Sequence, residues 1–346
     1  MYIKKIIIAI ALIGLVVAAF FAHYVYSVMF KPNTNFNNQT AYIYVPTGAT
    51  YQDVREQLKP LLKDIGDFDA LAEQKQYTTN IKAGKFGIEK GMNNNAIINS
   101  IRSNNIPITV AFNNQERIDK LAGRIATQIE ADSLSLLTAF NDSLFLNTNQ
   151  FTKATQLGMF IPNSYEFFWN TSAEQFRDRM LTEYNRFWNA NREAQAKAIG
   201  LSKNEVMTLA SIVHEESKQA SEQPRIAGVY LNRLKVGMPL QADPTLKFAA
   251  YQMPEYKDTI IKRVLNKHKL IVSPYNTYLY TGLPPGPIAM PDISAIDAVL
   301  HAEKHGYYYF AADPERLGYH KFAKNLTAHN ANARAYQNYL NKQGIR

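Results

Sequence analysis

The N-terminal apolar run constrains this chain more than any other feature. Residues 6–28 are 23 consecutive positions without Lys, Arg, Asp or Glu, enough for a helix to cross a bilayer core of about 30 Å. Lys4 and Lys5 precede the run and only Lys31 follows closely, so the positive-inside rule predicts a cytoplasmic N-terminus and an extracytoplasmic remainder. A cleaved signal peptide is the alternative, but the run is long and His23–Tyr26 lacks the small residues of a cleavage site. We therefore predict an uncleaved, single-pass anchor in the inner (cytoplasmic) membrane.

Composition narrows the class of protein. The chain has 346 residues, of which 46% are hydrophobic, so it can form two or three domains with packed cores. It contains no cysteine, which excludes disulfides, thiolate metal sites and a cysteine nucleophile. The net charge is +9, and Lys and Arg are spread along the chain, so no nucleic-acid-binding patch is predicted. An acidic polymer or a membrane surface remains a compatible partner.

A strand–turn–helix pattern occurs twice after the anchor. Residues 31–40 are polar, with one Pro and four Asn, and are predicted to be a linker. Residues 42–62 and 85–103 then each contain a short strand, a glycine turn and an amphipathic helix. Their key positions have identical spacings: Val45, Gly48, Val54 and Leu58 in one copy, and Ile88, Gly91, Ile97 and Ile101 in the other. Two such units predict one small α/β module over residues 41–107, although so common a pattern also arises by coincidence.

The rest of the chain, residues 108–346, is predicted to be one mixed α+β domain. Its signals follow in this order: a strand at 108–112, helices at 117–129 and 133–141, an irregular stretch at 142–157, an aromatic loop at 158–169, and long helices at 172–198 and 202–218. The predicted fold class is therefore α+β, with residues 1–30 as cytoplasmic tip and transmembrane helix, the small α/β module next, and the mixed α+β domain last.

Two adjacent glutamates end the last of these helices. One face of its helical wheel carries Val206, Leu209, Ala210, Val213 and Ser217. Glu216 lies at the edge of this face, and Glu215 points to the opposite side. A carboxyl group held against apolar packing has a raised pKa, which suits a proton donor near neutral pH. Glu216 is therefore the candidate acid; the alternative is a solvated or ion-paired residue at a helix end.

Three later segments supply further polar and aromatic side chains: Gln241 and Asp243, then Tyr275, Asn276 and Thr277, and finally His320, Asn325 and His329. The first pair lies on one side of the chain if that segment is extended. The second group precedes a proline-rich loop at 282–291, whose fixed torsions hold it rigidly. No HExxH or comparable spacing and no GxSxG motif occurs, so neither a metal nor a serine nucleophile is predicted. A single glutamic acid among amides, aromatic rings and rigid loops is typical of a carbohydrate cleft.

Four motifs carry a resemblance to a known family. They are ASIVHEES (Ala210–Ser217), VYLNRLKVGMPLQADPT (Val229–Thr245), SPYNTYLYTGLPPGPIAMP (Ser273–Pro291) and HKFAKNLTAHN (His320–Asn330). With the anchor and spacer, they resemble the endolytic murein transglycosylases of the MltG (YceG-like) type over essentially the whole chain. The resemblance implies that Glu216 is the catalytic glutamate and that residues 41–107 form a LysM-like module of the peptidoglycan-binding type. The family commonly has an acidic residue where this chain has His214, so the role of that position stays open.

The resemblance also implies the remaining site residues and the reaction. The substrate-binding residues it implies are Ser217, Gln241, Asp243, Tyr275, Asn276, Thr277, His320 and Asn325. Glu216 is expected to protonate the oxygen between N-acetylmuramic acid (MurNAc) and N-acetylglucosamine (GlcNAc), and then to accept the proton of the MurNAc C6 hydroxyl. That hydroxyl attacks C1 of its own sugar and gives a 1,6-anhydro end without consuming water. Expected partners are peptidoglycan glycan strands and, by family inference, peptidoglycan synthases; no cofactor is expected.

Two alternatives stay open at this stage. Asp243 would make the enzyme a muramidase-type hydrolase if it served as a second carboxyl at about 5–10 Å from Glu216. A membrane-anchored, wall-binding scaffold without catalysis is the other alternative. The presence of both acids in the expected order argues against the scaffold.

Overall fold

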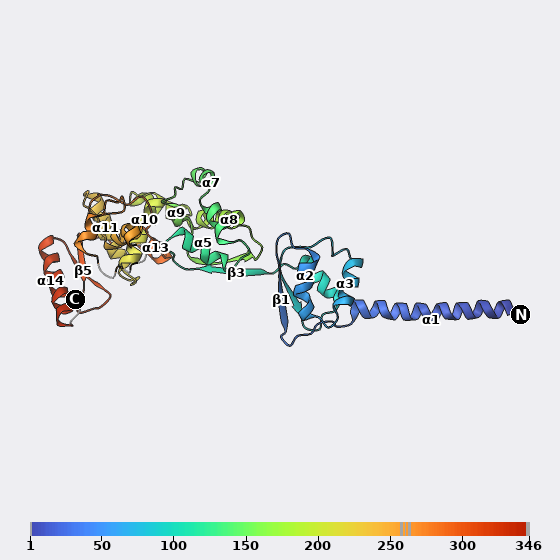
Figure 1. Cartoon of the computed structure of the whole chain (residues 1–346). Helices are drawn as coiled ribbons and strands as arrows, with labels where there is room; N and C mark the ends of the chain where they lie inside the picture. The colour runs from blue at the N-terminus through green and yellow to red at the C-terminus, as the bar shows by residue number, and fades with distance from the viewer. Residues whose placement is uncertain (1, 257–258, 260, 262–263, 344–346) are drawn as a thin grey trace. The chain divides into compact units, whose positions relative to one another are not determined.

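The structure is a computed structural model that describes residues 2–256, 259, 261 and 264–343 (Figure 1). The chain forms two units. The small unit contains the chain up to Val110, together with Gln128–Ala131 and Tyr165–Ser172. The large unit contains Ala111–Thr127, Asp132–Ser164 and the chain from Ala173 onwards. Helices and two-stranded sheets make the fold mixed α+β, which confirms the predicted class.

The small unit is built on an antiparallel strand pair. Its elements are α1 (Tyr2–Phe30), β1 (Thr40–Val45), α2 (Tyr51–Leu58), the 3-10 turn η1 (Lys59–Leu61), α3 (Ile65–Gln74), β2 (Gly84–Glu89) and α4 (Asn94–Ser103). β1 pairs with β2, and its alternation buries Ile43 and Val45 while Tyr42 and Tyr44 are exposed. The two predicted strand–turn–helix copies are therefore formed, as β1–α2 and β2–α4. The helix α3 lies between them and was not predicted.

The C-terminal end of α1 is part of the small unit's core. Val28 is 6% exposed and belongs to the same hydrophobic cluster as the inner face of β1. The Asn94 side-chain amide donates to the Val28 carbonyl at 2.8 Å. The Asn33 amide in turn donates to Asn94 Oδ1 and to the Asp64 carbonyl, each at 2.7 Å. Asn33 and Thr34, from the segment 31–40 that was predicted to be a linker, are buried, so part of that segment is packed structure.

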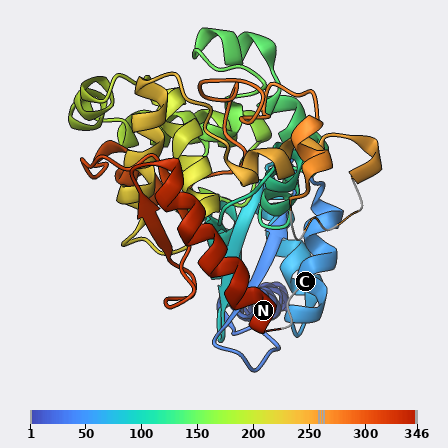
Figure 2. The same cartoon turned by 90° about the vertical axis from the view of Figure 1, so that its left-hand side faces the viewer.

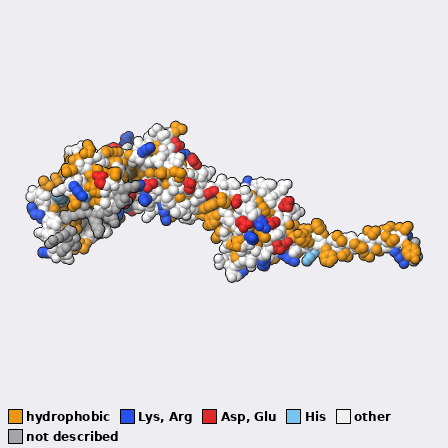
Figure 3. All heavy atoms as spheres, in the orientation of Figure 1, with side chains coloured by type: hydrophobic (Ala, Val, Ile, Leu, Met, Phe, Trp, Pro, Cys, Tyr) orange, Lys and Arg blue, Asp and Glu red, His pale blue; other side chains and the backbone are white. Residues whose placement is uncertain are grey.

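Among the described residues, α1 is the one helix long and apolar enough to cross a membrane, as judged by its length and composition. Hydrophobic side chains cover its surface (Figure 3). Such a helix near an N-terminus has the properties of a membrane anchor and also those of a signal sequence.

The large unit is mainly helical. Its helices are α5 (Ile118–Ala126), α6 (Ser133–Phe140), α7 (Ser143–Thr148), α8 (Ala173–Phe187), α9 (Ala190–Ala198), α10 (Lys203–Glu216), α11 (Gln223–Lys235), α12 (Asp243–Tyr251), α13 (Ile293–Leu300) and α14 (Leu326–Lys342), with 3-10 turns η2 (Gln156–Met159), η3 (Pro254–Tyr256) and η4 (Asn266–Leu270). The strands β5 (Tyr309–Ala312) and β6 (His320–Ala323) pair antiparallel, and α14 packs along them (Figure 2). β3 (Pro107–Phe112) pairs with β4 (Asn163–Phe168), and both strands are divided between the two units.

The central helix of the large unit is α10. All residues from Val206 to His214 are buried, because α11, α12 and α13 pack around them. A capping box between Ser202 and Glu205 fixes the start of the helix. A helix that is buried on all sides holds its end in a defined place, and the residue at that end is Glu216.

Three local predictions differ from the structure. The Asn189 side chain caps a new helix and divides the predicted helix 172–198 into α8 and α9. Asp142 caps α7 inside the stretch predicted to be irregular. Residues 163–168 of the predicted aromatic loop form β4. The causes are side-chain caps and pairing with a distant strand, which hydrophobic periodicity does not report.

Candidate functional site

The two adjacent glutamates of α10 have different surroundings. Glu216 is partly buried, whereas Glu215 is 35% exposed at its side chain and forms an ion pair with Lys218 Nζ at 3.1 Å. The Tyr230 hydroxyl of α11 donates to Glu216 Oε1 at 2.5 Å. The structure therefore has the asymmetry that the helical wheel predicts.

Glu216 has the properties of a proton donor near neutral pH. Burial, the largest cause, raises its pKa from 4.5 to about 7. The negative charge of Asp243 also raises this pKa, while the Tyr230 hydrogen bond and the charges of His320 and Arg233 lower it. Near pH 7 the carboxyl is therefore present in both protonation states, as a group that first gives and then takes a proton requires.

A cavity of about 300 Å³ lies at Glu216. Its walls come from α10, α11, the turn before α12, β5, β6 and α14. The lining includes four residues of the sequence-predicted site, namely Glu216, Gln241, Asp243 and His320. The fold thus brings together polar side chains from segments that are far apart in the sequence.

Gln241 and Asp243 reach this cavity by an unexpected route. The segment is not extended, because Gln241 has a φ of +49° and Asp243 is the first residue of α12. A left-handed backbone at a residue other than glycine costs about 1 kcal/mol. The Gln241 N–H donates to the Thr277 carbonyl at 3.0 Å, which holds the turn. Asp243 Oδ1 accepts from the Tyr278 hydroxyl at 2.6 Å.

Asn276 and Thr277, both predicted to bind substrate, are buried. The Asn276 amide donates to two backbone carbonyls, at 2.8 and 3.0 Å, and its Oδ1 accepts from the Tyr278 N–H. Thr277 Oγ1 accepts from the Ala242 N–H at 3.0 Å. In the structure these side chains hold the cavity wall in place. Tyr275 packs against Phe248, with ring centroids 4.6 Å apart, and lines a second cavity.

A buried carboxylate, Glu222, orients His320. The His320 N–H and its Nδ1 each lie 2.8 Å from a Glu222 carboxylate oxygen. The hydroxyl of Ser217, another predicted site residue, donates to Glu222 Oε2 at 3.4 Å. Because a carboxylate accepts hydrogen bonds, Nδ1 carries a hydrogen that it donates to Glu222.

Asn325, a predicted site residue, and His214, whose role the sequence leaves open, do not line the cavity at Glu216. Asn325 is exposed and caps α14, where its Oδ1 accepts from the Ala328 N–H at 2.9 Å. His214 is buried, with Nδ1 at 3.3 Å from Asp292 Oδ2, and burial lowers its pKa. In the described part of the chain, no group of three or more His, Asp and Glu residues is placed to hold a metal ion.

Several cavity residues were missed by the sequence reasoning, namely Tyr230, Arg233, Tyr278 and the orienting residue Glu222. Arg233 is buried and donates to the carbonyls of Tyr308 and Leu240, each at 2.6 Å. A signal for it is present in the sequence, since Arg233 lies at helical spacing from the apolar residues Ile226 and Val229. A charged residue in an apolar stripe is rarely buried without a dedicated role.

Comparison with known proteins gives the family. The sequence pattern of the YceG-like family matches residues 43–335. The chain is 29% identical over 334 residues to the endolytic murein transglycosylase of Bacillus subtilis (strain 168), with 91% of this chain and 89% of that protein covered. It is 25% identical over 324 residues to the endolytic murein transglycosylase of Streptococcus pneumoniae, with 85% of this chain and 58% of that protein covered.

A solved structure gives the same relationship. The chain resembles the crystal structure of a YceG-like protein from Listeria monocytogenes with a TM-score of 0.57 and 25% sequence identity. The match covers 85% of this chain and 99% of that one. The chain belongs to the YceG-like family.

Proposed function

We propose that this protein is a membrane-anchored endolytic peptidoglycan transglycosylase. It cleaves the MurNAc-β-1,4-GlcNAc bond within glycan strands and leaves 1,6-anhydroMurNAc ends. The names of its relatives support this reaction class. The observation that carries the proposal is Glu216, a carboxyl with a pKa of about 7 that faces a cavity and is held by Tyr230.

The first half of the reaction breaks the glycosidic bond. Protonated Glu216 gives its proton to the glycosidic oxygen while the bond from that oxygen to C1 of MurNAc breaks, and GlcNAc leaves with a free 4-hydroxyl. Positive charge develops at C1 and the ring oxygen. Glu216, now ionised, and Asp243 on the same cavity wall stabilise that charge. Because the Tyr230 hydroxyl bonds to Oε1, Oε2 is the oxygen that carries the proton.

The second half forms the anhydro ring. The C6 hydroxyl of the same MurNAc attacks C1, and its proton passes to Glu216, which restores the acid. One carboxyl is sufficient because the nucleophile belongs to the substrate and its effective concentration is high. His320, fixed by Glu222, and Gln241 bind the sugar's hydroxyl and N-acetyl groups.

The test uses the full chain in detergent micelles and uncrosslinked glycan strands. Products are analysed by mass spectrometry before and after borohydride reduction. We expect ends one water lighter than hydrolysis products and resistant to borohydride, and a loss of about 10²- to 10⁴-fold in rate for Glu216→Gln. The control, Glu193→Gln, removes an exposed ion pair with Lys203 and is expected to retain the wild-type rate. Equal activity of Glu216→Gln and wild type would reject the assignment.

A muramidase-type hydrolase is the second candidate, and Asp243 is the observation that favours it. Asp243 faces the same cavity as Glu216, and its charge raises the pKa of Glu216. In a hydrolase Asp243 would stabilise or attack C1 before water arrives. Products that borohydride reduces would establish this candidate in place of the transglycosylase.

We further propose that α1 spans the inner (cytoplasmic) membrane, with the N-terminus in the cytoplasm and both units outside, beside peptidoglycan synthases. Residues 41–107 form a LysM-like module, a proposal supported by the order β1–α2–α3–β2 with antiparallel strands. Because the chain has no cysteine, single cysteines can be introduced and labelled with a membrane-impermeant maleimide. We expect Lys82→Cys to react in spheroplasts and Lys4→Cys to react only after permeabilisation; the reverse result would reject the topology.

A further inference from the structure

Arg233 of α11 is a buried cation that forms no ion pair with any of the described residues. It is only 6% exposed, yet it lines the cavity at Glu216. Arg225, an exposed arginine on the same helix, pairs with Glu303 at 2.9 Å. A charge that is taken out of water without a counter-charge costs free energy. The position of Arg233 therefore calls for a negative group that the protein itself does not supply.

The guanidinium of Arg233 is only partly used by the protein. Nε donates to the Tyr308 carbonyl at 2.6 Å, and Nη1 donates to the carbonyls of Leu240 and Pro239 at 2.6 and 3.4 Å. These carbonyls fix the side chain but carry no net charge. Nη2 bonds to none of the described residues, and it is not sealed from solvent. Because Arg233 lines the cavity, this nitrogen offers its two N–H donors to a ligand there.

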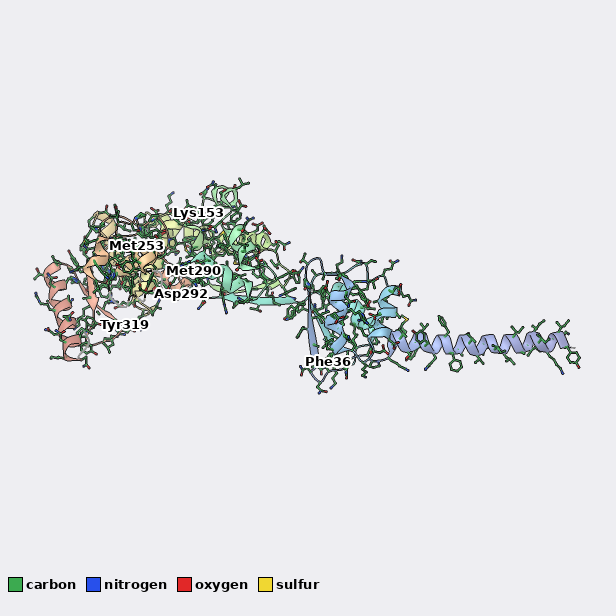
Figure 4. The ribbon with its side chains drawn as sticks, viewed as in Figure 1. Phe36, Lys153, Met253, Met290, Asp292 and Tyr319 are labelled. Atoms are coloured by element: carbon green, nitrogen blue, oxygen red, sulfur yellow. The ribbon has the colours of Figure 1, made fainter. Side chains whose placement is uncertain are left out.

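Two aromatic rings of the same wall flank the guanidinium. The Tyr309 ring centroid lies 5.3 Å from Arg233 Cζ, and this ring stacks on His329 with centroids 5.3 Å apart. Burial lowers the pKa of His329, and the positive charge of Arg233 lowers it further. His329 is therefore neutral near pH 7, and the positive charge of these three side chains resides on Arg233. His320 of this wall directly follows Tyr319, which is labelled in Figure 4.

The charge of Arg233 is uncompensated when Glu216 is ready to donate its proton. Burial lowers the pKa of the Arg233 guanidinium, and the negative charge of ionised Glu216 partly offsets this. Protonated Glu216, the form that acts as an acid, carries no charge and gives no such support. Asp243, the other acidic residue of the wall, accepts from the Tyr278 hydroxyl at 2.6 Å. A negative group on the bound ligand would supply the missing charge.

We propose that Arg233 binds a carboxylate of the substrate beside Glu216, so that the enzyme selects glycans whose sugar at the cleaved bond carries a negative charge. A singly charged carboxylate fits better than a phosphate dianion, because Asp243 on the same wall repels a second negative charge. A carboxylate on the lactyl group also distinguishes MurNAc from GlcNAc, so this contact selects the sugar that is held at Glu216. That carboxylate is free on strands without peptides, which are the strands that Arg233 favours. The inference rests on the proposed function for the identity of the sugar chain.

The first measurement is binding without turnover. The full chain in detergent carries Glu216→Gln, which prevents cleavage and leaves position 216 uncharged. It is titrated calorimetrically with a tetrasaccharide of alternating GlcNAc and MurNAc that has free lactyl carboxylates, and with the same tetrasaccharide converted to methyl amides. We expect a Kd about 10-fold lower for the carboxylate form. Equal Kd values for the two forms would overturn the inference.

Two variants in this background assign the preference to Arg233. In Arg233→Met the two tetrasaccharides should bind with equal Kd. In Arg233→Lys the preference should fall, because one ammonium cannot bond to the Tyr308 and Leu240 carbonyls and also reach the ligand. The control Arg186→Met removes an exposed arginine of α8 and should keep the full preference. A preference that persists in both Arg233 variants overturns the inference.

The second measurement is cleavage of peptide-free strands before and after their carboxylates are converted to methyl amides. With position 216 restored to Glu, we expect kcat/KM to be about 10-fold lower on the amidated strands for wild type and Arg186→Met, and equal on both strands for Arg233→Met. Equal kcat/KM of wild type on both strands overturns the inference and leaves the proposed reaction intact. Absence of cleavage of either strand overturns the reaction, and the tetrasaccharide Kd values then still decide the role of Arg233.

Discussion

Removal of the Glu216 charge is expected to stabilise the protein at alkaline pH. The folded state raises the pKa of Glu216 from 4.5 to about 7, so the unfolded chain gives up this proton at lower pH than the folded protein does. The stability associated with the protonated carboxyl is fully present below pH 4.5, and it is lost as the pH rises to about 7. Glu216→Gln keeps a neutral group that still accepts the Tyr230 hydrogen bond, and it avoids the cost of a buried charge.

The size of this effect follows from the pKa difference. A pKa difference of about 2.5 units, at about 1.36 kcal/mol per unit, corresponds to roughly 3 kcal/mol of unfolding free energy above pH 7. Since Glu216 is partly exposed, this value is an upper bound. For a unit of about 200 residues, a change of 1 kcal/mol shifts Tm by about 2–4 °C. Glu216→Gln is therefore expected to have a Tm up to about 6–12 °C higher than wild type at pH 8.

The assay is thermal unfolding of the full chain in detergent, at pH 4 and at pH 8. The chain contains two tryptophans, Trp169 in the small unit and Trp188 in the large unit. In a Trp169→Phe background, the fluorescence of buried Trp188 reports on the large unit alone. We expect the Tm difference between Glu216→Gln and wild type to be near zero at pH 4 and large at pH 8, and absent for Glu193→Gln at both. A Tm difference that is the same at both pH values would refute the reasoning.

Three further predictions concern the residues around Glu216. Tyr230→Phe removes a hydrogen bond that lowers the pKa of Glu216, so the alkaline limb of kcat/KM should move up by about one pH unit; an unmoved limb contradicts this. Glu222→Gln weakens the hydrogen bonds that orient His320 and should lower kcat/KM about 10-fold, with partial rescue in Glu222→Asp. An unchanged kcat/KM of the Glu222→Gln variant would contradict the orienting role of Glu222. Asn276→Ala leaves two buried carbonyls without donors and should cost about 2–4 kcal/mol of stability, measured as a lower Tm at every pH. An unchanged Tm would show that Asn276 does not hold the wall.

The sequence predicted features that a single element determines. Residues spaced three and four apart define one face of α10, so the different surroundings of Glu215 and Glu216 followed from the helical wheel alone. The helix predicted at 133–141 is formed as α6, and the Asp132 side chain caps it by accepting from the Ser135 N–H. Both features depend on neighbours within a few residues.

Features that depend on distant contacts were harder to predict. Asn276 is polar and near a rigid loop, which suits a ligand contact, yet its donors bond to backbone carbonyls. A side-chain amide can form hydrogen bonds to a sugar hydroxyl or to the backbone carbonyls of a turn, so residue type does not distinguish the two uses. Tyr230 lies at helical spacing from the apolar residue Ile226, and only the packing of α11 on α10 shows its hydroxyl at Glu216.

The buried end of α1 has a mechanical consequence. Since we propose that α1 spans a bilayer, about 20 residues counted from Ile6 fill the hydrocarbon layer and end near Val25. Val28, three residues later, is already in the small unit's core, and its carbonyl is bonded to Asn94. At about 1.5 Å per residue, only about one helical turn separates lipid from packed protein. The helix is therefore rigidly coupled to the small unit and is not a flexible linker, so any tilt of α1 in the membrane turns the small unit with it.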